Sequence, residues 1–255
     1  MIALTRRGLY RFSMRFGLKA GLAAMDYYRF FEYPLVAREL KATEGMVILD
    51  IGSRRSIFPL FLATRGCVVY ATDIDEMVFD QINMASRAGL NHLIEDERFI
   101  AEKQDTRRLT YPDHYFHRVT AISTLEHITV DGDIEAMQEI GRVLCGGGQA
   151  VITLPFARRY SEIQPSSCQG AFTRQYDAEA INKRIVKPSG LKLVHRQYFG
   201  ERDFKFNIYW AKFPYLLRIA LHPLVPLFSY LFLSIVEEHD LEKAYDGICL
   251  TLRKE

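Results

Sequence analysis

The feature that most constrains the fold is a hydrophobic segment that ends in a one-glycine turn. Residues 47–56 read Val-Ile-Leu-Asp-Ile-Gly-Ser-Arg-Arg-Ser. We expect residues 46–51 to form a buried strand, Gly52 to begin the turn and residues 57–64 to continue as a helix. Ligands bind at the carboxyl end of such a strand, near the N–H groups of the following helix. Nucleoside sites of this kind usually have two or three glycines in the turn, and this chain keeps one.

Strands and helices alternate after this unit. Helical spacing predicts helices at 76–88 and 134–144, and the three glycines at 146–148 are expected to break the chain. This alternation is typical of parallel βαβ units with right-handed crossovers. The other predicted strands are 67–72, 99–101, 118–123, 150–154, 191–198 and 247–253.

The composition limits the size class and the partners. A chain of 255 residues with 49% hydrophobic content can bury one full core. The net charge of +2 gives no general argument for binding nucleic acid, so we expect no nucleic-acid partner. The four cysteines form no Cys-x-x-Cys pair and no histidines cluster at zinc spacing, so we expect no metal site and a cytoplasmic location. Arg11 and Arg15 interrupt the N-terminal apolar stretch, which is therefore not a secretion signal.

Polar residues follow the predicted parallel strands, where a ligand would bind. The carboxyl ends of such strands meet at one edge of the sheet, so we expect these side chains to lie together. The residues are Asp50, Gly52 and Ser53 after the first strand, Asp73 after the second, Asp105 and Thr106 after the third, and Ser123 to His127 after the fourth.

Asp73 is the candidate for binding a ribose. It lies 21 residues beyond Gly52, and a carboxylate at the end of the second strand accepts hydrogen bonds from both ribose hydroxyls. The alternative is that Asp73 caps the helix beginning near Glu76, for which Asp75 competes.

Taken in order, these motifs resemble those of the class I S-adenosylmethionine-dependent methyltransferases, in particular the small-molecule type 11 branch. The resemblance covers residues 46 to about 200 and rests on five segments. They are 47–53, the Ala-Thr-Asp-Ile-Asp of 71–75, 104–113, the Ala-Ile-Ser-Thr-Leu-Glu-His-Ile of 121–128, and 140–148.

The resemblance implies a fold, a cofactor and roles for particular residues. The fold is a Rossmann-like α/β sheet, doubly wound and seven-stranded, mostly parallel with an antiparallel last strand. S-adenosyl-L-methionine is the implied cofactor and a small molecule the implied acceptor. Asp73 would hold the ribose and Asp105 the adenine amino group. The implied cofactor-binding set is Asp50, Gly52, Ser53, Asp73, Ile74, Asp105, Thr106 and Ser123.

We expect one domain over residues 1–255. Residues 1–44 would be an N-terminal helical extension, 45–200 the cofactor-binding core, 204–243 an apolar helical insert and 244–255 the last strand.

The glycine turn departs from its two nearest patterns. A nicotinamide dehydrogenase would need Gly-x-Gly-x-x-Gly, which fails after Gly52. In the methyltransferase pattern, Arg54 and Ser56 stand where glycines are usual. Ser56 is small and suited to capping the next helix. Arg54 has three possible roles: it points into solvent, it fills the cofactor's place, or it pairs with the cofactor carboxylate.

His127 is the candidate base for an acceptor hydroxyl. It follows the fourth strand, and histidine titrates near neutral pH. The alternative is that Glu126 and His127 only solvate the loop end. Two such residues are too few to argue for a metal.

Two segments suggest contact with a membrane. Residues 219–236 contain no Lys, Arg, Asp or Glu, although Pro223 and Pro226 argue against one straight helix. Residues 1–25 are basic with no acid, and residues 7–20 have amphipathic helical spacing. Peripheral contact through residues 1–25 and 208–236, at the inner face of the membrane, would suit a lipid-linked or hydrophobic acceptor. A pocket lid, ordinary core, a homodimer contact and, least favoured, a membrane span are the alternatives for the insert.

Two function classes therefore remain. The first is a methyltransferase that transfers the methyl group in line to a small molecule. The second is a non-catalytic relative, with an altered glycine turn, that acts as a membrane-associated binding partner.

Overall fold

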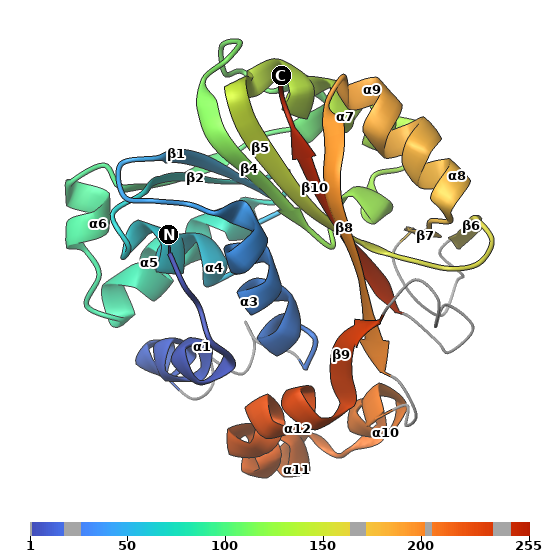
Figure 1. Cartoon of the computed structure of the whole chain (residues 1–255). Coiled ribbons are helices and arrows are strands. Elements are labelled where there is room, and N and C mark those ends of the chain that lie inside the picture. The colour runs from blue at the N-terminus through green and yellow to red at the C-terminus, as the bar shows by residue number, and fades with distance from the viewer. Residues whose placement is uncertain (1, 18–26, 164–171, 202–205, 237–245) are drawn as a thin grey trace.

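The computed structural model describes residues 2–17, 27–163, 172–201, 206–236 and 246–255. A central sheet runs through the molecule with helices on both faces, as Figure 1 shows. Each face has its own hydrophobic core, and Ile48 and Val69 belong to one while Leu49 and Ile51 belong to the other. The predicted doubly wound α/β fold is confirmed.

The first five strands of the sheet are parallel to one another. β1 (Val47–Ile51) pairs with β2 (Val68–Asp73) and β4 (Phe116–Ile122). β3 (Phe99–Lys103) and β5 (Leu144–Pro155) extend the sheet on either side. The chain order therefore reverses at β1, which places a ligand crevice beside that strand.

The remaining strands are antiparallel to their neighbours. β10 (Gly247–Arg253) lies between β5 and β8 (Lys192–Glu201), which confirms the antiparallel last strand. The sheet has eight strands, in the order β3-β2-β1-β4-β5-β10-β8-β9, so the predicted number of seven is wrong. The extra edge strand, β9 (Leu233–Val236), comes from the insert that was expected to be helical, and it pairs with the end of β8.

The glycines at 146–148 do not break the chain before the fifth strand. β5 begins at Leu144 and includes them. The N–H of Gly147 donates to the carbonyl of Lys254, and the N–H of Lys254 donates to the carbonyl of Gly148. Gly147 has a φ of +73°, and the pairing of β5 with β4 passes from Leu144 directly to Gln149, so the glycines interrupt that pairing within the strand. The chain after β10 supplies hydrogen-bond partners for this segment instead.

Helices from different parts of the chain cover the two faces. α3 (Arg29–Leu40), α4 (Phe58–Ala63) and α5 (Asp80–Arg87) lie below the sheet in Figure 1. α7 (Gly132–Val143), α8 (Ala178–Ala180) and α9 (Lys187–Ser189) lie above it, and α6 (His92–Glu95) precedes β3. A π-helix over Ile181–Val186 joins α8 to α9. Short 3-10 helices cover Glu76–Phe79, Thr106–Arg108 and Leu125–His127.

The N-terminal helix and the insert lie at the same end of the molecule. α1 (Arg6–Ser13) continues into a 3-10 turn at Met14–Phe16, and the insert forms α10 (Phe206–Lys212), α11 (Tyr215–Leu221), a 3-10 turn at His222–Leu224 and α12 (Val225–Phe232). α1 contacts α12, and both lie at the lower edge of Figure 1. Within the described residues, none of the helices has the length and apolar character needed to cross a membrane.

Candidate functional site

Two cavities lie at the carboxyl ends of β1, β2 and β4. Their volumes are about 480 Å³ and about 470 Å³. We call the first the Asp73 cavity and the second the Asp50 cavity, after the acid that lines each. Both are also lined by Gly52, Arg54, Ser123 and His127. They therefore form the two halves of one cleft, at the edge of the sheet that the sequence predicts.

Asp73 is buried and lines the cavity named after it. Its Oδ1 accepts a hydrogen bond of 2.8 Å from the N–H of Asp75, and its Oδ2 accepts one of 3.2 Å from the N–H of Arg54. The helical turn that follows is capped by Asp75, whose Oδ1 accepts from the N–H of Met77 at 3.0 Å. The capping role considered for Asp73 is therefore filled by Asp75. Burial raises the pKa of Asp73.

The rest of the Asp73 cavity combines an exposed apolar side chain with a paired acid. Ile74 lines it and is 61% exposed, which leaves its flat apolar surface uncovered. Thr106 is buried beside it. Asp105 caps the turn at Thr106–Arg108, and the guanidinium of Arg107 binds it at 2.6 Å and 2.9 Å. This ion pair, which the sequence analysis did not foresee, lowers the pKa of Asp105.

Asp50 and Ser53 are tied to each other and to the sheet. The hydroxyl of Ser53 donates to one carboxylate oxygen of Asp50 and that of Thr120 to the other, each at 2.5 Å. The burial of Asp50 is the dominant influence on its pKa and raises it to about 6. Asp50 thus holds the turn in shape as well as lining the cavity.

Gly52 occupies a position that no other residue fits. Its φ is +71°, and a Cβ built there would lie 2.2 Å from the side chain of Thr124. The glycine is needed both for the left-handed backbone and for the close approach of the loop after β4.

Arg54 lies at the rim of the cleft. It has a φ of +35°, as the glycine that usually occupies this position would allow, and its side chain is 58% exposed. Its Nη2 is 3.4 Å from Asp75 Oδ2 and 3.3 Å from the sulfur of Met77. Ser56 accepts a hydrogen bond of 3.1 Å from the N–H of Phe58, the first residue of α4, but the N-cap of that helix is Ile57.

A third cavity of about 460 Å³ adjoins the cleft. We call it the Glu32 cavity. Arg29 lines both this cavity and the Asp50 cavity, and Ser123 lines this cavity and both halves of the cleft. Glu32 is buried, and its Oε1 accepts hydrogen bonds from Ser123 at 2.9 Å and Thr153 at 3.1 Å. Its Oε2 pairs with Arg29 at 2.7 Å.

Glu32 and Arg29 were missed by the sequence analysis. The available signal was an Arg and a Glu three residues apart within an otherwise aromatic segment of a helix, which places both side chains on one face.

His127 lines both halves of the cleft, and its side chain is 51% exposed. Its Nδ1 lies 2.9 Å from the carbonyl oxygen of Phe172, so the tautomer with a proton on Nδ1 leaves Nε2 free to accept a proton. Nε2 is 3.8 Å from Glu126. Burial raises the pKa of Glu126 to about 8, and its Oε2 has no partner among the described residues.

Replacement of Glu126 by glutamine should flatten the pH dependence of stability between pH 6 and 8. The ordinary pKa of the group is 4.5 and burial raises it to about 8, so throughout this window the unfolded chain has already lost the proton that the folded chain keeps. The stability of the wild-type chain therefore falls as pH rises toward 8, and the glutamine variant lacks this contribution. Urea unfolding of both proteins at pH 6 and pH 8 measures the difference. Equal changes in the two proteins would show that Glu126 is ionised in the fold.

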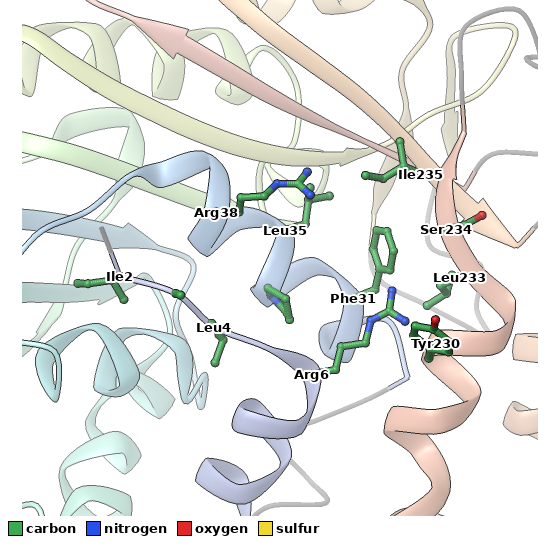
Figure 2. A pocket seen from close by; sticks show the side chains of 12 residues that line it. Ile2, Leu4, Arg6, Phe31, Leu35, Arg38, Tyr230, Leu233, Ser234 and Ile235 are labelled. Atoms are coloured by element: carbon green, nitrogen blue, oxygen red, sulfur yellow. The ribbon is translucent and has the colours of Figure 1, made fainter.

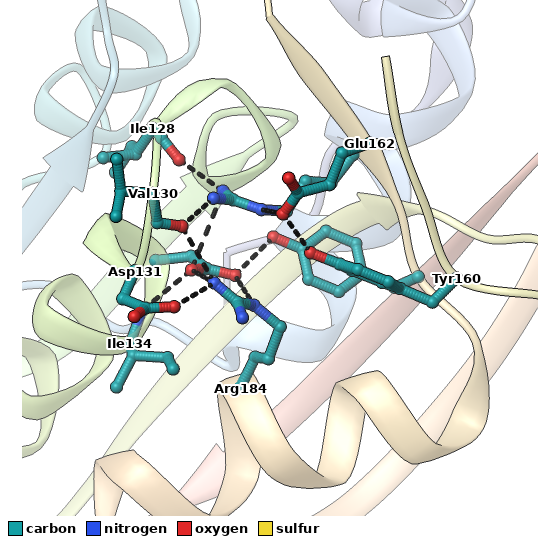
Figure 3. A network of polar contacts seen from close by, with 10 residues as sticks. Ile128, Val130, Asp131, Ile134, Tyr160, Glu162 and Arg184 are labelled. Atoms are coloured by element: carbon teal, nitrogen blue, oxygen red, sulfur yellow. Dashed lines mark hydrogen bonds and ion pairs between the residues drawn. The ribbon is translucent and has the colours of Figure 1, made fainter. Parts of the chain in front are cut away.

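A buried ionic network holds the loop that carries His127 (Figure 3). Arg174, which is fully buried, donates to the carbonyls of Ile128 and Val130. Asp133 lies 3.7 Å from Arg174 and accepts hydrogen bonds of 2.7 Å and 2.9 Å from Arg184. The network therefore connects this loop to β7 (Thr173–Gln175), α7 and the π-helix. Across the described ranges, no group of His, Cys, Asp and Glu residues is arranged to hold a metal ion.

The comparison with protein families shows which family the residues of this cleft resemble. A family model described as "Methyltransferase domain" matches residues 49–152, which run from β1 into β5 and include nearly all of the cleft. Residues 49–152 are therefore similar to a methyltransferase domain of the type 11 family. The resemblance predicted from the sequence is thus confirmed. The cofactor of this class is S-adenosyl-L-methionine, as the sequence predicts.

Solved structures share the fold of this chain. The [4+2]-cyclase SpnF is 19% identical with a TM-score of 0.61, and the match covers 100% of this chain and 98% of that chain. An S-adenosylmethionine-dependent methyltransferase from Mesorhizobium loti is 14% identical with a TM-score of 0.56, covering 88% and 97%. The 1,6-didemethyltoxoflavin-N1-methyltransferase of Burkholderia thailandensis, solved with S-adenosylhomocysteine, is 16% identical with a TM-score of 0.53, covering 83% and 72%. The comparison with curated proteins gave no match.

Proposed function

We propose that this chain is an S-adenosylmethionine-dependent methyltransferase whose acceptor is a small molecule. The observation that carries the proposal is the continuity of three cavities. The Asp73 and Asp50 cavities share four lining residues, and the Glu32 cavity joins them at Ser123. An elongated cofactor and a separate acceptor would occupy such a cleft and its side chamber.

The residues present fit the cofactor. Asp73 keeps acceptor capacity for ribose hydroxyls, since each of its oxygens accepts one hydrogen bond from the described residues and has room for another. Ile74 offers an uncovered apolar surface to the adenine, beside Asp105 and Thr106. The methionine end would then lie toward Gly52 and the Asp50 cavity.

The chemistry needed from the chain is alignment and proton removal. When bound, the cofactor supplies a methyl group already activated by a sulfonium. The chain's contribution is to hold the acceptor in line and to exclude water. His127 is the proposed base, because its Nε2 is free to accept a proton and the side chain lines the cleft.

The lining of the Glu32 cavity favours an acceptor with hydrogen-bonding groups. Tyr28 donates to Asp246 at 3.0 Å on one side of it, and Glu32 lies on another. Leu154, Phe156 and Phe199 supply apolar contacts. An acceptor carrying a hydroxyl or amine on an apolar frame matches this lining.

Calorimetric titration with S-adenosylmethionine and S-adenosylhomocysteine tests the proposal. We expect micromolar binding to the wild-type chain and a loss of binding in Asp73→Ala, because the ribose loses its acceptor. Absence of binding at millimolar cofactor would contradict the proposal.

Arg54 decides between the methyltransferase and the second function class, a non-catalytic relative, because its side chain either permits or blocks cofactor binding. We expect Arg54→Gly to change the dissociation constant for S-adenosylhomocysteine by less than about fivefold, since an exposed ion pair such as Arg54–Asp75 contributes about 0–1 kcal/mol. The same titration measures it. A gain above tenfold would mean that the guanidinium blocks the cofactor, which would favour the non-catalytic class. A loss above tenfold would mean that it binds the cofactor.

We further propose peripheral contact with anionic membranes through α1 and the insert. Several large apolar side chains of the insert are exposed, among them Leu216, Leu227, Tyr230 and Leu231. Arg7 and Arg11 are exposed on α1, which contacts α12. The described residues 2–17 and 206–236 contain no acid. An acid-free apolar face rimmed by arginines suits an anionic lipid surface.

Flotation with vesicles of phosphatidylglycerol and phosphatidylcholine tests this contact. We expect the wild-type chain to float and the Leu216→Ser/Leu231→Ser variant to remain below, with Ile163→Ser as a control at an exposed apolar residue elsewhere. Equal flotation of both serine variants and the wild type would contradict it. A wild-type dimer that the double variant loses, without flotation, would instead assign the face to a homodimer contact.

A further inference from the structure

The largest of these cavities lies outside the cleft, between the N-terminal segment, α3 and β9 (Figure 2). Its volume is about 850 Å³, within the range of about 300–1,000 Å³ for ligand pockets. None of its lining residues belongs to the Asp73, Asp50 or Glu32 cavity. It is therefore separate from the place of methyl transfer.

Most of the lining is apolar. Leu4, Leu35, Leu233 and Ile235 are among the side chains that form its walls. The described residues that line it include no acid, and the two charged ones are both arginines. Arg38 already donates to Glu39 at 3.1 Å and to Gln197 at 2.5 Å.

Arg6, by contrast, has no anionic partner among the described residues. Its guanidinium lies 5.0 Å from the ring centre of Phe31 and 5.4 Å from that of Tyr230, and Figure 2 shows it beside both rings. Its Nη1 is buried, with no hydrogen-bond partner among the described residues. Burial lowers its pKa, which reflects the cost of keeping this charge away from water. A buried guanidinium nitrogen is normally paired, so this one is an open position for an anion.

We propose that this cavity binds a single-chain amphiphile with an anionic head group, the head at Arg6 and the apolar tail along Leu35 and Ile235. The shared chemistry of the head is an oxyanion, carboxylate or phosphate, which accepts from Nη1. Because the lining comes from the N-terminal segment, α3, α12 and β9, the ligand would fasten these elements together. The site is independent of cofactor binding.

Calorimetry and thermal unfolding of the full chain with three probes test the site: laurate, dodecyl phosphate and the neutral dodecanol. We expect at least one anionic probe to bind and to raise the melting temperature, and dodecanol to bind at least tenfold more weakly. The stronger of laurate and dodecyl phosphate identifies the head group. Equal binding of dodecanol would overturn the proposal, because Arg6 would then contribute nothing.

Two variants and one control locate the binding. Arg6→Gln should weaken the anionic probe at least tenfold, whereas Arg7→Gln, exposed one residue along the same helix, should leave it unchanged. Ala3→Phe, which fills the cavity without altering Arg6, should abolish binding in a folded chain. S-adenosylhomocysteine binding should be the same in all three, so a failure here is distinguishable from a failure of the methyltransferase proposal. Unchanged probe binding in Arg6→Gln and Ala3→Phe would overturn the site.

Discussion

Replacement of Gly52 by alanine is expected to weaken S-adenosylhomocysteine binding at least tenfold and to lower the free energy of unfolding by about 2–4 kcal/mol. The first cause is the backbone, because a φ of +71° is strained for any residue with a Cβ. The second is steric, since the new Cβ would lie 2.2 Å from the Thr124 side chain and force the loop after β4 to move. Calorimetry and urea unfolding measure the two effects.

Gly45→Ala is the matched control for this prediction. Gly45 has a similar φ of +82°, but a Cβ there would meet no atom within 4 Å. We expect Gly45→Ala to lower the free energy of unfolding by about 1–2 kcal/mol, through backbone strain alone, and to leave cofactor binding unchanged. If Gly52→Ala behaved like Gly45→Ala in both measurements, the close approach of Gly52 and Thr124 would not shape the cleft.

Replacement of Asp133 by alanine should lower the free energy of unfolding by about 3–5 kcal/mol. Asp133 is fully buried and is the acid that lies between Arg174 and Arg184. Its removal would leave buried guanidinium groups without that counter-charge and would free the hydroxyl of Tyr176, which donates to it at 2.9 Å. Breaking a buried pair from one side costs this much because the remaining charge stays desolvated.

Two further variants test whether the loss comes from removing a buried charge or from removing any partner of Arg184. Asp131→Ala removes an exposed partner of the same Arg184 and should cost less than about 1 kcal/mol. Asp133→Asn keeps the shape and should fall between the two. A loss in Asp133→Ala no larger than in Asp131→Ala would mean that water reaches the arginines in the fold.

The sequence was sufficient to place the cleft because parallel strands bring their carboxyl ends together. Asp73 and Asp105 are far apart in sequence but line one cavity. Asp73 is the last residue of β2, and Asp105 follows β3, the strand that pairs with β2. The third and fifth motif segments of the family also have a structural basis. Arg142 from the fifth binds Asp113 at 2.7 Å and the carbonyl of Leu109 at 3.0 Å. Such motifs can be recognised in the sequence because each one determines the conformation of a single turn.

What the sequence could not indicate depends on partners distant in the chain. β9 becomes a strand because the edge of β8 is available to it, which helical spacing in the insert does not reveal. Glu32 lines the cavity beside the cleft because α3 packs near β5, where the hydroxyl of Thr153 donates to it. Asp105 pairs with Arg107, which is close in sequence, yet residue type alone does not say whether Arg107 or Arg108 binds it.

A crystal structure grown with S-adenosylhomocysteine tests the central claim most directly. We expect density for the ligand along the cleft, with the ribose hydroxyls within hydrogen-bond distance of Asp73, the adenine against Ile74 and the homocysteine end toward Gly52 and Ser53. Density at another site, or an empty cleft at millimolar ligand, would contradict the claim that this cleft is a cofactor site.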